Sequence, residues 1–370
     1  MRKLLFLASE DWFFARHFLP MARKVRTVGF EVAVAARITD HGTEIANEGL
    51  RVVPIDFNRG HFQSLVPLHA VKQLIQTIRQ ERPDVIHCIG LPLVVLGGIA
   101  ARLAGVKALV LAPTGLGHLW TADSKRATLL RPFVRVLVGR TLNGKTTHYV
   151  FENHEDHKEF GLTARNSSLT FVSGAGTDPT VFCWTDEPSS PPVKVAVVSR
   201  MLRSKGIVET VQAVRLAISR GVNLELHLFG APDPSNPTSL STEELQQLSS
   251  VDGVWWHGYS TDIPGVWRDH HIAMLLSHRE GLPNSLVEAA ACGRPIVTCD
   301  VVGCREVVRN GVDGFLVSKN EITEAADRLA ELARSSELRR RMGAEARGRF
   351  LNEFTVEKVS ETIASLYRKL

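Results

Sequence analysis

The sequence contains few cysteines and no long apolar run, and each absence excludes a class of protein. Five cysteines in 370 residues are an odd number, and they form neither a C-x-x-C pair nor a zinc-binding set with histidine. We therefore expect reduced, mostly buried thiols and no zinc site. No apolar stretch is long enough to span a membrane, and Met1-Arg2-Lys3 leads into a short apolar segment without a cleavage signal. These absences predict a protein that stays in the cytoplasm.

The sequence also lacks the features of a repeat protein and of a nucleic-acid-binding protein. No internal repeat of short period occurs. The isoelectric point is about 9.0, but there is no recognisable nucleic-acid-binding module and no basic stripe with interleaved aromatic residues. The formal net charge of +5 belongs to residues 1–188, which hold 22 Lys and Arg against 17 Asp and Glu, whereas the remainder is balanced. We expect no nucleic-acid partner.

Short apolar runs alternate with helix-like segments along the whole chain, a pattern typical of parallel sheets covered by helices on both faces. Residues 183–192 are polar and proline-rich, and proline continues neither a helix nor a central strand. The length and the 44% of apolar residues suffice for two cores. We predict an α/β protein with an N-terminal domain at 1–182, a linker at 183–192, a C-terminal domain at 193–354 and a final helix at 355–370. Strands are predicted at 4–8, 31–35, 51–55, 84–89, 107–112, 148–151 and 168–172, and then at 193–199, 224–229, 254–256, 272–276, 295–298 and 314–317.

The most informative segment is the loop E-G-L-P-N-S-L-V-E at 280–288, which follows a predicted strand and leads into a predicted helix. In open α/β sheets, ligands bind at the carboxyl ends of the strands, and a helix N-terminus offers free N–H groups to a phosphate or hydroxyl. Glu280 can hydrogen-bond the hydroxyls of one sugar, and Glu288, about two turns further along, can reach a second ring such as a ribose. The segment predicts a sugar-nucleotide site. A helix start and a solvated face are the alternative roles for two glutamates at this spacing.

A second candidate site follows the predicted strand at 193–199. Arg200 and Lys205 are cations at the carboxyl end of this strand. Fixed cations stabilise the charge that develops on a diphosphate leaving group, without any proton transfer. A solvated turn is the alternative, because basic residues are common in loops. Arg203 lies between them, and we assign it no role.

Further motifs follow the first loop in a fixed order: C-G-R-P-I-V at 292–297, G-C-R-E-V-V at 303–308 and G-V-D-G-F-L-V at 311–317. With the segment at 280–288, they resemble the retaining glycosyltransferases of family 4, especially bacterial members that build surface polysaccharides or act on undecaprenyl-linked sugars. The resemblance implies a GT-B fold, in which two Rossmann-like domains face each other with their parallel sheets across a cleft. It also implies that the final helix crosses back to the N-terminal domain.

The resemblance implies that a sugar moves from a nucleotide-diphosphate donor, a UDP-sugar, to a hydroxyl of a lipid-linked or growing saccharide in cell-surface polysaccharide synthesis. The anomeric configuration is retained, the nucleotide sugar is a co-substrate, and neither a cofactor nor a metal is needed, since Arg200 and Lys205 hold the diphosphate and no D-x-D motif stands out. Glu280 holds donor-sugar hydroxyls rather than acting as a nucleophile. The remaining donor-binding residues implied are Gly230, Gly258, Tyr259, Gly281, Leu282, Pro283, Asn284, Ser285 and Glu288.

On the acceptor side, the implied site residues lie in loops after three predicted strands of the first half. They are Asp11, Trp12, Thr114, Gly115, Gly117, His118 and Asn153. Many family members hold a catalytic histidine near the T-G-L-G-H run. Whether Thr114 or His118 takes its place stays open, and a structural role is the alternative for His118. The G-A-G-T-D turn at 174–178 matches a family motif with a hinge or cleft-lining role.

The segment from Lys125 to Lys145 contains six cations and no acidic residue, interleaved with apolar side chains. Such a basic amphipathic segment can lie on an anionic lipid surface, on the inner face of the membrane, and it can also hold the phosphates of a lipid-linked acceptor. The alternative is a surface helix whose apolar face packs on its own sheet.

Two other functions share the same fold and cleft. A nucleotide-sugar epimerase needs no acceptor, and a non-catalytic sugar-nucleotide-binding subunit performs no chemistry at all. The basic, apolar acceptor side argues against the first, and the intact set of Arg200, Lys205, Glu280 and Glu288 argues against the second. A phosphorylase would need a pyridoxal-binding lysine, and Lys205 is better explained as a diphosphate contact.

Overall fold

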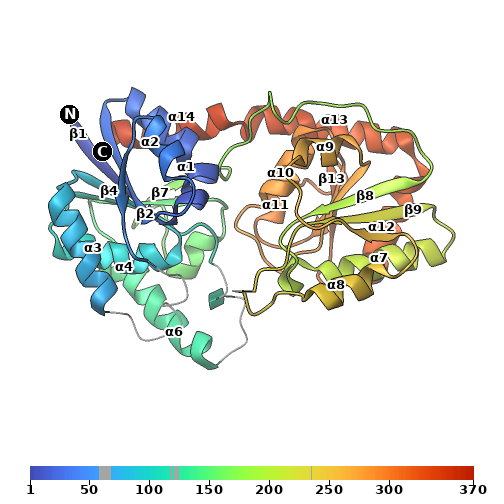
Figure 1. Ribbon diagram of the computed structural model, residues 1–370, viewed down its shortest axis with the longest axis horizontal. Coiled ribbons are helices and arrows are strands. Elements are labelled where there is room, and N and C mark those ends of the chain that lie inside the picture. The colour runs from blue at the N-terminus through green and yellow to red at the C-terminus, as the bar shows by residue number, and fades with distance from the viewer. Residues whose placement is uncertain (58–67, 117–118, 121–124, 235) are drawn as a thin grey trace. The chain divides into compact units, whose positions relative to one another are not determined.

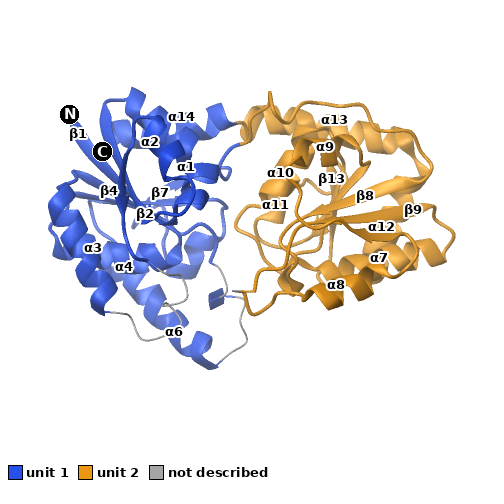
Figure 2. Ribbon diagram, viewed as in Figure 1, with its two compact units in different colours: residues 1–176, 356–370 blue, residues 177–355 orange. Residues whose placement is uncertain are grey.

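The structure is a computed structural model that describes residues 1–57, 68–116, 119–120, 125–234 and 236–370 (Figure 1). It divides into two compact units (Figure 2). Unit 1 comprises residues 1–176 and 356–370, and unit 2 comprises residues 177–355. Each unit contains one parallel sheet with its own buried core.

The sheet of unit 1 has seven parallel strands in the order β3-β2-β1-β4-β5-β6-β7. Apolar side chains alternate between its faces: Leu5 and Leu7 of β1 belong to one buried cluster, and Leu4 and Phe6 to the other. Both faces are therefore covered by helices, as the near-continuous apolar strands predict. The strands are β1 Arg2–Glu10, β2 Phe30–Arg37, β3 Arg51–Pro54, β4 Val85–Ile89, β5 Ala108–Ala112, β6 Thr147–Phe151 and β7 Ser168–Phe171. The helices are α1 Asp11–Thr27, α2 Gly42–Asn47, α3 Leu68–Glu81, α4 Leu91–Leu103, α6 Lys125–Val136 and α14 Val356–Lys369.

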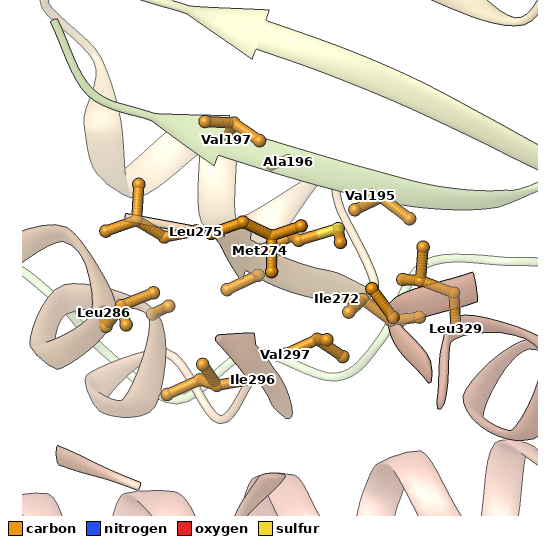
Figure 3. Packing of buried hydrophobic residues seen from close by; sticks show 14 of the residues in the cluster. Val195, Ala196, Val197, Ile272, Met274, Leu275, Leu286, Ile296, Val297 and Leu329 are labelled. Atoms are coloured by element: carbon orange, nitrogen blue, oxygen red, sulfur yellow. The ribbon is translucent and has the colours of Figure 1, made fainter. Parts of the chain in front are cut away.

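The sheet of unit 2 has six parallel strands in the order β10-β9-β8-β11-β12-β13. Its core lies around the central strands, where Val195 and Val197 of β8, Met274 of β11, Leu286 and Leu329 are packed together (Figure 3). The strands are β8 Val193–Val198, β9 Leu224–Phe229, β10 Val254–Trp256, β11 Ile272–Leu275, β12 Ile296–Cys299 and β13 Gly314–Val317. The helices are α7 Ile207–Ser219, α8 Thr242–Ser249, α9 Ile263–Arg268, α10 Asn284–Ala291, α11 Cys304–Val307, α12 Ile322–Arg334 and α13 Ser336–Glu353.

Both sheets contain a point at which the strand order reverses. It lies between β1 and β4 in unit 1, and between β8 and β11 in unit 2. Connections leave the two strands in opposite directions there, which opens a crevice at their carboxyl ends, the usual place for a ligand in such sheets. In unit 2, the loops that follow β8 and β11 carry the predicted Arg200, Lys205 and Glu280.

Every predicted strand is present, and each boundary lies within two residues of the prediction. The predicted α/β class with two parallel sheets is therefore confirmed. The final predicted helix is α14, which belongs to unit 1: Val359 and Ile363 join its core, and the Tyr367 hydroxyl lies 2.7 Å from Nδ1 of the buried His87. Four of the cysteines are buried, and Cys183 is exposed. None of the described helices is both long and apolar enough to cross a membrane.

The segment 183–192, predicted to be a linker, is part of unit 2. The Thr185 carbonyl accepts a hydrogen bond of 2.6 Å from Nη2 of Arg294, and Glu187 accepts one of 2.8 Å from Nε of Arg339. Both arginines are buried. Buried guanidinium groups need partners, and this polar stretch supplies them. The chain passes between units at 176/177 and again at 355/356.

Candidate functional site

The loops after β8 and β11 bring Lys205 and Glu280 together, although they lie 75 positions apart in the sequence. The Lys205 ammonium donates to both carboxylate oxygens of Glu280, with Nζ 2.6 Å from Oε1 and 2.8 Å from Oε2. Their side chains are 21% and 9% exposed, respectively. The strand-order reversal of unit 2 thus holds a cation and an anion side by side. Because both side chains are largely buried, the effective dielectric is lower there than in water, and electrostatic interactions are stronger.

Lys205 is placed by a tight loop that only glycine can complete. It ends the 3₁₀ turn Arg203–Lys205, and the next residue, Gly206, has a φ of +68°. A Cβ atom at Gly206 would lie 2.0 Å from the carbonyl oxygen of Leu276, at the end of β11. The two loops are also joined by a hydrogen bond of 3.0 Å from the His278 N–H to the Ser204 carbonyl. Close backbone contact therefore sets the separation of the two charged side chains.

Glu280 is placed by a second glycine, Gly303, which has a φ of +84°. A Cβ atom there would lie 2.6 Å from the Gly281 carbonyl oxygen and 2.8 Å from that of Glu280. The Glu280 N–H donates to the Val302 carbonyl over 3.3 Å. Gly303 opens the motif G-C-R-E-V-V at 303–308, but the sequence did not predict its contact with the Glu280 loop. The local sign of this contact is the glycine itself, because glycine favours the positive φ that this position adopts.

The predicted helix after the loop is present as α10, which begins at Asn284. The Pro283 carbonyl accepts hydrogen bonds from the N–H groups of Leu286 and Val287. Leu282 and Pro283 are buried, and Ser285 and Glu288 are half-buried on the first turns of the helix. Residues 280–283 thus belong to the loop between β11 and α10, and residues 284–288 form the first turns of that helix.

Arg200 leaves the end of β8 but does not join the Lys205–Glu280 pair. Its Nη1 lies 2.8 Å from Oδ2 of Asp233, and its side chain is 58% exposed. An exposed ion pair is weak, so a diphosphate oxygen could replace the Asp233 carboxylate at little cost. Arg203, the cation without an assigned role, pairs with Glu244 of α8.

Gly230 shapes the end of β8 from the neighbouring strand. Its φ is +148°, and a Cβ atom there would lie 1.7 Å from the Ser199 carbonyl oxygen. The Gly230 N–H donates to the Gly258 carbonyl over 2.7 Å, and its carbonyl accepts 2.9 Å from Nε1 of Trp256. The contact of Gly230 with Ser199 holds the backbone directly before Arg200, so Gly230 has a positioning role. Gly258 is followed by Tyr259, which is exposed.

The structure adds two groups beside Lys205 and Glu280 that the sequence did not predict. His278 Nε2 lies 3.2 Å from Oε1 of Glu209, in the first turn of α7. The thiol of Cys304 is fully buried, and burial, reinforced by the charge of Glu280, raises its pKa. Cys304 thus stays a neutral thiol beside the pair. His278 lies two residues before Glu280 in the same loop, and Cys304 is brought to the site because β12 pairs with β11.

In unit 1, two predicted acceptor residues anchor loops. Asp11 is buried, and its carboxylate accepts hydrogen bonds from the N–H groups of Trp12, Thr39 and His41 and from the Thr39 hydroxyl, at 2.7–2.9 Å. Burial alone would raise the pKa of Asp11, but these hydrogen bonds, those from Thr39 foremost, lower it. Asn153 is also buried, and its Oδ1 accepts from the Asp156 N–H over 2.8 Å. Both residues position the loops around them.

The other predicted acceptor residues lie after β1 and β5. Trp12 is half-exposed, and its ring forms a T-shaped contact with that of Phe13, with centroids 5.8 Å apart. Thr114 and Gly115 are half-buried, and Gly115 has a φ of +67°. Gly117 and His118 lie outside the described residues, so the choice between Thr114 and His118 stays as the sequence left it. Among the residues that the structure describes, no group of three or more His, Cys, Asp or Glu side chains could hold a metal ion.

Comparison with known proteins follows the division into units. Residues 3–149, in unit 1, match the family described as "Glycosyl transferase 4-like", and residues 186–349, in unit 2, match "Glycosyl transferases group 1".

Two relatives and one solved structure are similar to the chain over different spans. The capsular polysaccharide biosynthesis glycosyltransferase CapM of Staphylococcus aureus is 28% identical over 173 residues, which are 47% of this chain and 45% of CapM. The N,N'-diacetylbacillosaminyl-diphospho-undecaprenol alpha-1,3-N-acetylgalactosaminyltransferase of Campylobacter jejuni is 23% identical over 338 residues, 87% of each protein. The Anabaena protein HepE, solved in complex with UDP, is similar over 100% of both chains, with a TM-score of 0.78 and 18% identity. The structural likeness confirms the predicted GT-B fold.

Proposed function

Because the chain belongs to the glycosyltransferases, with a 4-like domain in unit 1 and a group 1 domain in unit 2, we propose that it transfers a sugar from a UDP-sugar to a lipid-linked saccharide. The product is part of a cell-surface polysaccharide. The observation that carries the proposal is the Lys205–Glu280 pair at the strand-order reversal of unit 2. HepE, whose structure contains UDP, supports the donor, and the diphospho-undecaprenol in the name of the Campylobacter relative supports the acceptor.

In this proposal, unit 2 is the donor side. Glu280 accepts hydrogen bonds from hydroxyls of the donor sugar, while the Lys205 ammonium, 2.6 Å away, turns toward the diphosphate. Arg200 exchanges Asp233 for a second diphosphate oxygen. The first turn of α10, with Asn284 and Ser285, presents N–H groups to the donor, and Glu288 takes the ribose. Gly230, Gly258 and Tyr259 border the nucleotide.

The chemistry is substitution at the anomeric carbon with retention. The bond from this carbon to the diphosphate oxygen breaks, and its electron pair leaves with the diphosphate. The acceptor hydroxyl oxygen forms the new bond on the same face of the sugar, and its proton passes to the departing diphosphate. Arg200 and Lys205 stabilise the charge that grows on the leaving group, so no metal is required. Glu280 forms no covalent bond in this scheme.

Unit 1 is the acceptor side. Trp12 lies in the first turn of α1, directly after β1, and Thr114 and Gly115 lie in the loop after β5; β1 and β5 flank β4 in the sheet. A half-exposed indole can stack on a sugar ring of the acceptor. Asp11 and Asn153 act indirectly, because each holds the backbone of its loop. A lipid-linked acceptor would keep the enzyme on the inner face of the membrane.

A donor and acceptor screen tests the proposal. Purified protein is given UDP-, GDP- and ADP-sugars, with and without a polyprenyl-diphosphate sugar, and the released nucleotide and the product are measured. We expect release only with a UDP-sugar and acceptor, and a loss of about a hundredfold in Glu280→Ala. Glu331→Ala is the matched control, because Glu331 forms an exposed ion pair on α12 with Arg328. Its activity should equal that of the wild type.

Two outcomes would overturn the proposal. A change in the donor sugar without any acceptor would identify a nucleotide-sugar epimerase. Tight binding of a nucleotide sugar without turnover, across all donors and acceptors, would identify a non-catalytic binding subunit.

A further inference from the structure

The outward face of α6 carries large apolar side chains that stay exposed in the part of unit 1 that the structure describes. Leu129, Phe133 and Val136 are 76%, 58% and 53% exposed, and Leu130 is 44% exposed. The first three follow one another at helical spacing and form a stripe about 10 Å long. Figure 1 shows α6 on the outside of unit 1. The opposite side of the helix packs inward through the buried Ala127 and Val134. The sequence-based alternative, an apolar face packed on its own sheet, therefore fails for these four residues.

The helix is held firmly at its C-terminal end, so this exposure is built into the fold. A π-helical turn, Leu137–Thr141, follows α6, and a Cβ atom at Gly139 would lie 1.9 Å from the Phe160 carbonyl oxygen. The buried Tyr149 hydroxyl donates to the Val138 carbonyl over 2.6 Å. Arg135 pairs with Glu159, with Nη2 2.5 Å from Oε2. These contacts fix which side of α6 faces outward.

Exposed cations flank the apolar stripe and form no ion pair with the acidic residues that the structure describes. Lys125 and Arg126 are exposed in the first turn of α6, and Arg140 is exposed just beyond its end. In the part of the chain that the structure describes, no acidic side chain forms an ion pair with any of the three. Two cations at a helix N-terminus oppose the helix dipole and cost stability. These cations destabilise the helix, but they are well placed to bind an external anionic surface.

We propose that this face, defined by Lys125, Arg126, Leu129, Phe133 and Val136, docks on an anionic phospholipid bilayer. The apolar side chains enter the boundary between headgroups and acyl chains, while the cations meet the lipid phosphates. An exposed apolar cluster alone would suit a protein partner equally well. The unpaired cations around it favour a negatively charged membrane. The inference deepens the proposed function and rests on it, since a lipid-linked acceptor would lie in that membrane.

Vesicle flotation with the full chain tests the proposal. The vesicles contain phosphatidylcholine alone or with phosphatidylglycerol at about a third of the lipid. We expect binding only to the anionic vesicles. Leu129→Ser with Phe133→Ser should weaken it about a hundredfold, since each large apolar side chain contributes about tenfold. Lys125→Gln with Arg126→Gln should weaken it by about 25-fold, or about fivefold for each cation.

Control variants on two other helices of unit 1 separate this surface from general effects of removing a cation or an exposed leucine. Lys72→Gln with Arg79→Gln removes two exposed cations from α3, and Leu103→Ser removes an exposed leucine at the end of α4. These variants should bind as the wild type does. Thermal unfolding shows that each variant is folded.

Three results would overturn the proposal: equal binding to neutral and anionic vesicles, unchanged binding of both α6 variants, or a dimeric wild type that Leu129→Ser with Phe133→Ser makes monomeric in sedimentation velocity. The last result would assign the face to a second copy of the chain. Failure of the proposed function would look different. Vesicle binding would depend on α6 as expected, but no donor would be turned over with a detergent-solubilised acceptor.

Discussion

The strongest test of the site is a double-mutant cycle on Lys205 and Glu280. Lys205→Met removes the ammonium but keeps the length of the side chain, and it leaves a carboxylate that is 9% exposed without its two hydrogen bonds. Exposed ion pairs contribute about 0–1 kcal/mol, whereas breaking a buried pair costs about 3–5 kcal/mol. The burial of this pair lies between the two cases, so we expect a loss of about 2 kcal/mol.

Glu280→Gln should cost less, about 1 kcal/mol, because the Lys205 side chain is 21% exposed and water can reach its ammonium. The double variant should lose less than the sum of the single variants, with a coupling free energy of about 1.5 kcal/mol. Urea unfolding followed by tryptophan fluorescence measures this, because Trp184, Trp255, Trp256 and Trp267 all lie in unit 2.

The Arg200–Asp233 pair is the control for this cycle. It has a similar geometry, with Nη1 2.8 Å from Oδ2, but Arg200 is 58% exposed. Its coupling free energy, from Arg200→Gln and Asp233→Asn, should be below about 0.5 kcal/mol. Equal coupling free energies for the two pairs would refute the argument that burial strengthens the Lys205–Glu280 pair.

Two further predictions concern stability. Gly206→Ala should lower the stability of unit 2 by about 3 kcal/mol, since a Cβ atom would lie 2.0 Å from the Leu276 oxygen at a φ of +68°. Gly221→Ala should cost only about 1 kcal/mol, because its φ is +80° but no atom lies within 4 Å of the added Cβ. Equal losses of stability in thermal unfolding would contradict this prediction. Burial lowers the pKa of His87 to about 3, below its ordinary value near 6.5, so the unfolded state binds more protons between these values. The stability of unit 1 should be full above about pH 6.5 and fall by at most about 1.4 kcal/mol per pH unit toward pH 3, with a smaller fall in His87→Gln. Urea unfolding across this pH range measures both slopes, and equal slopes would show that His87 is not responsible.

The strands could be predicted from the sequence because their signal is local. A strand buried on both faces is apolar over four to six successive residues, as β5 and β11 are. The loops that follow such strands are then placed at the ligand-binding edge of the sheet. This reasoning placed Arg200, Lys205 and Glu280 at the edge of a sheet before any coordinates were known.

The roles of Asp11 and Asn153 could not be predicted in the same way. A carboxylate or amide after a strand can bind a ligand or hold a loop, and both roles produce the same local pattern. For Asp11, the backbone of Thr39 and His41, which follows the neighbouring strand β2, supplies the partners. For Asn153, the partner is the nearby Asp156. The structure therefore assigns both residues to loop anchoring.

The sequence by itself determined the α/β class, the strands found among the described residues and the segments that carry the charged residues, because apolar periodicity and loop chemistry are properties of neighbouring residues. Only the tertiary structure decided which charges meet. Lys205 faces Glu280 because β8 pairs with β11, whereas Arg200 lies against Asp233. It also decided that Leu129 and Phe133 of α6 stay exposed, since helical spacing shows that a helix has two faces but not which of them the protein covers.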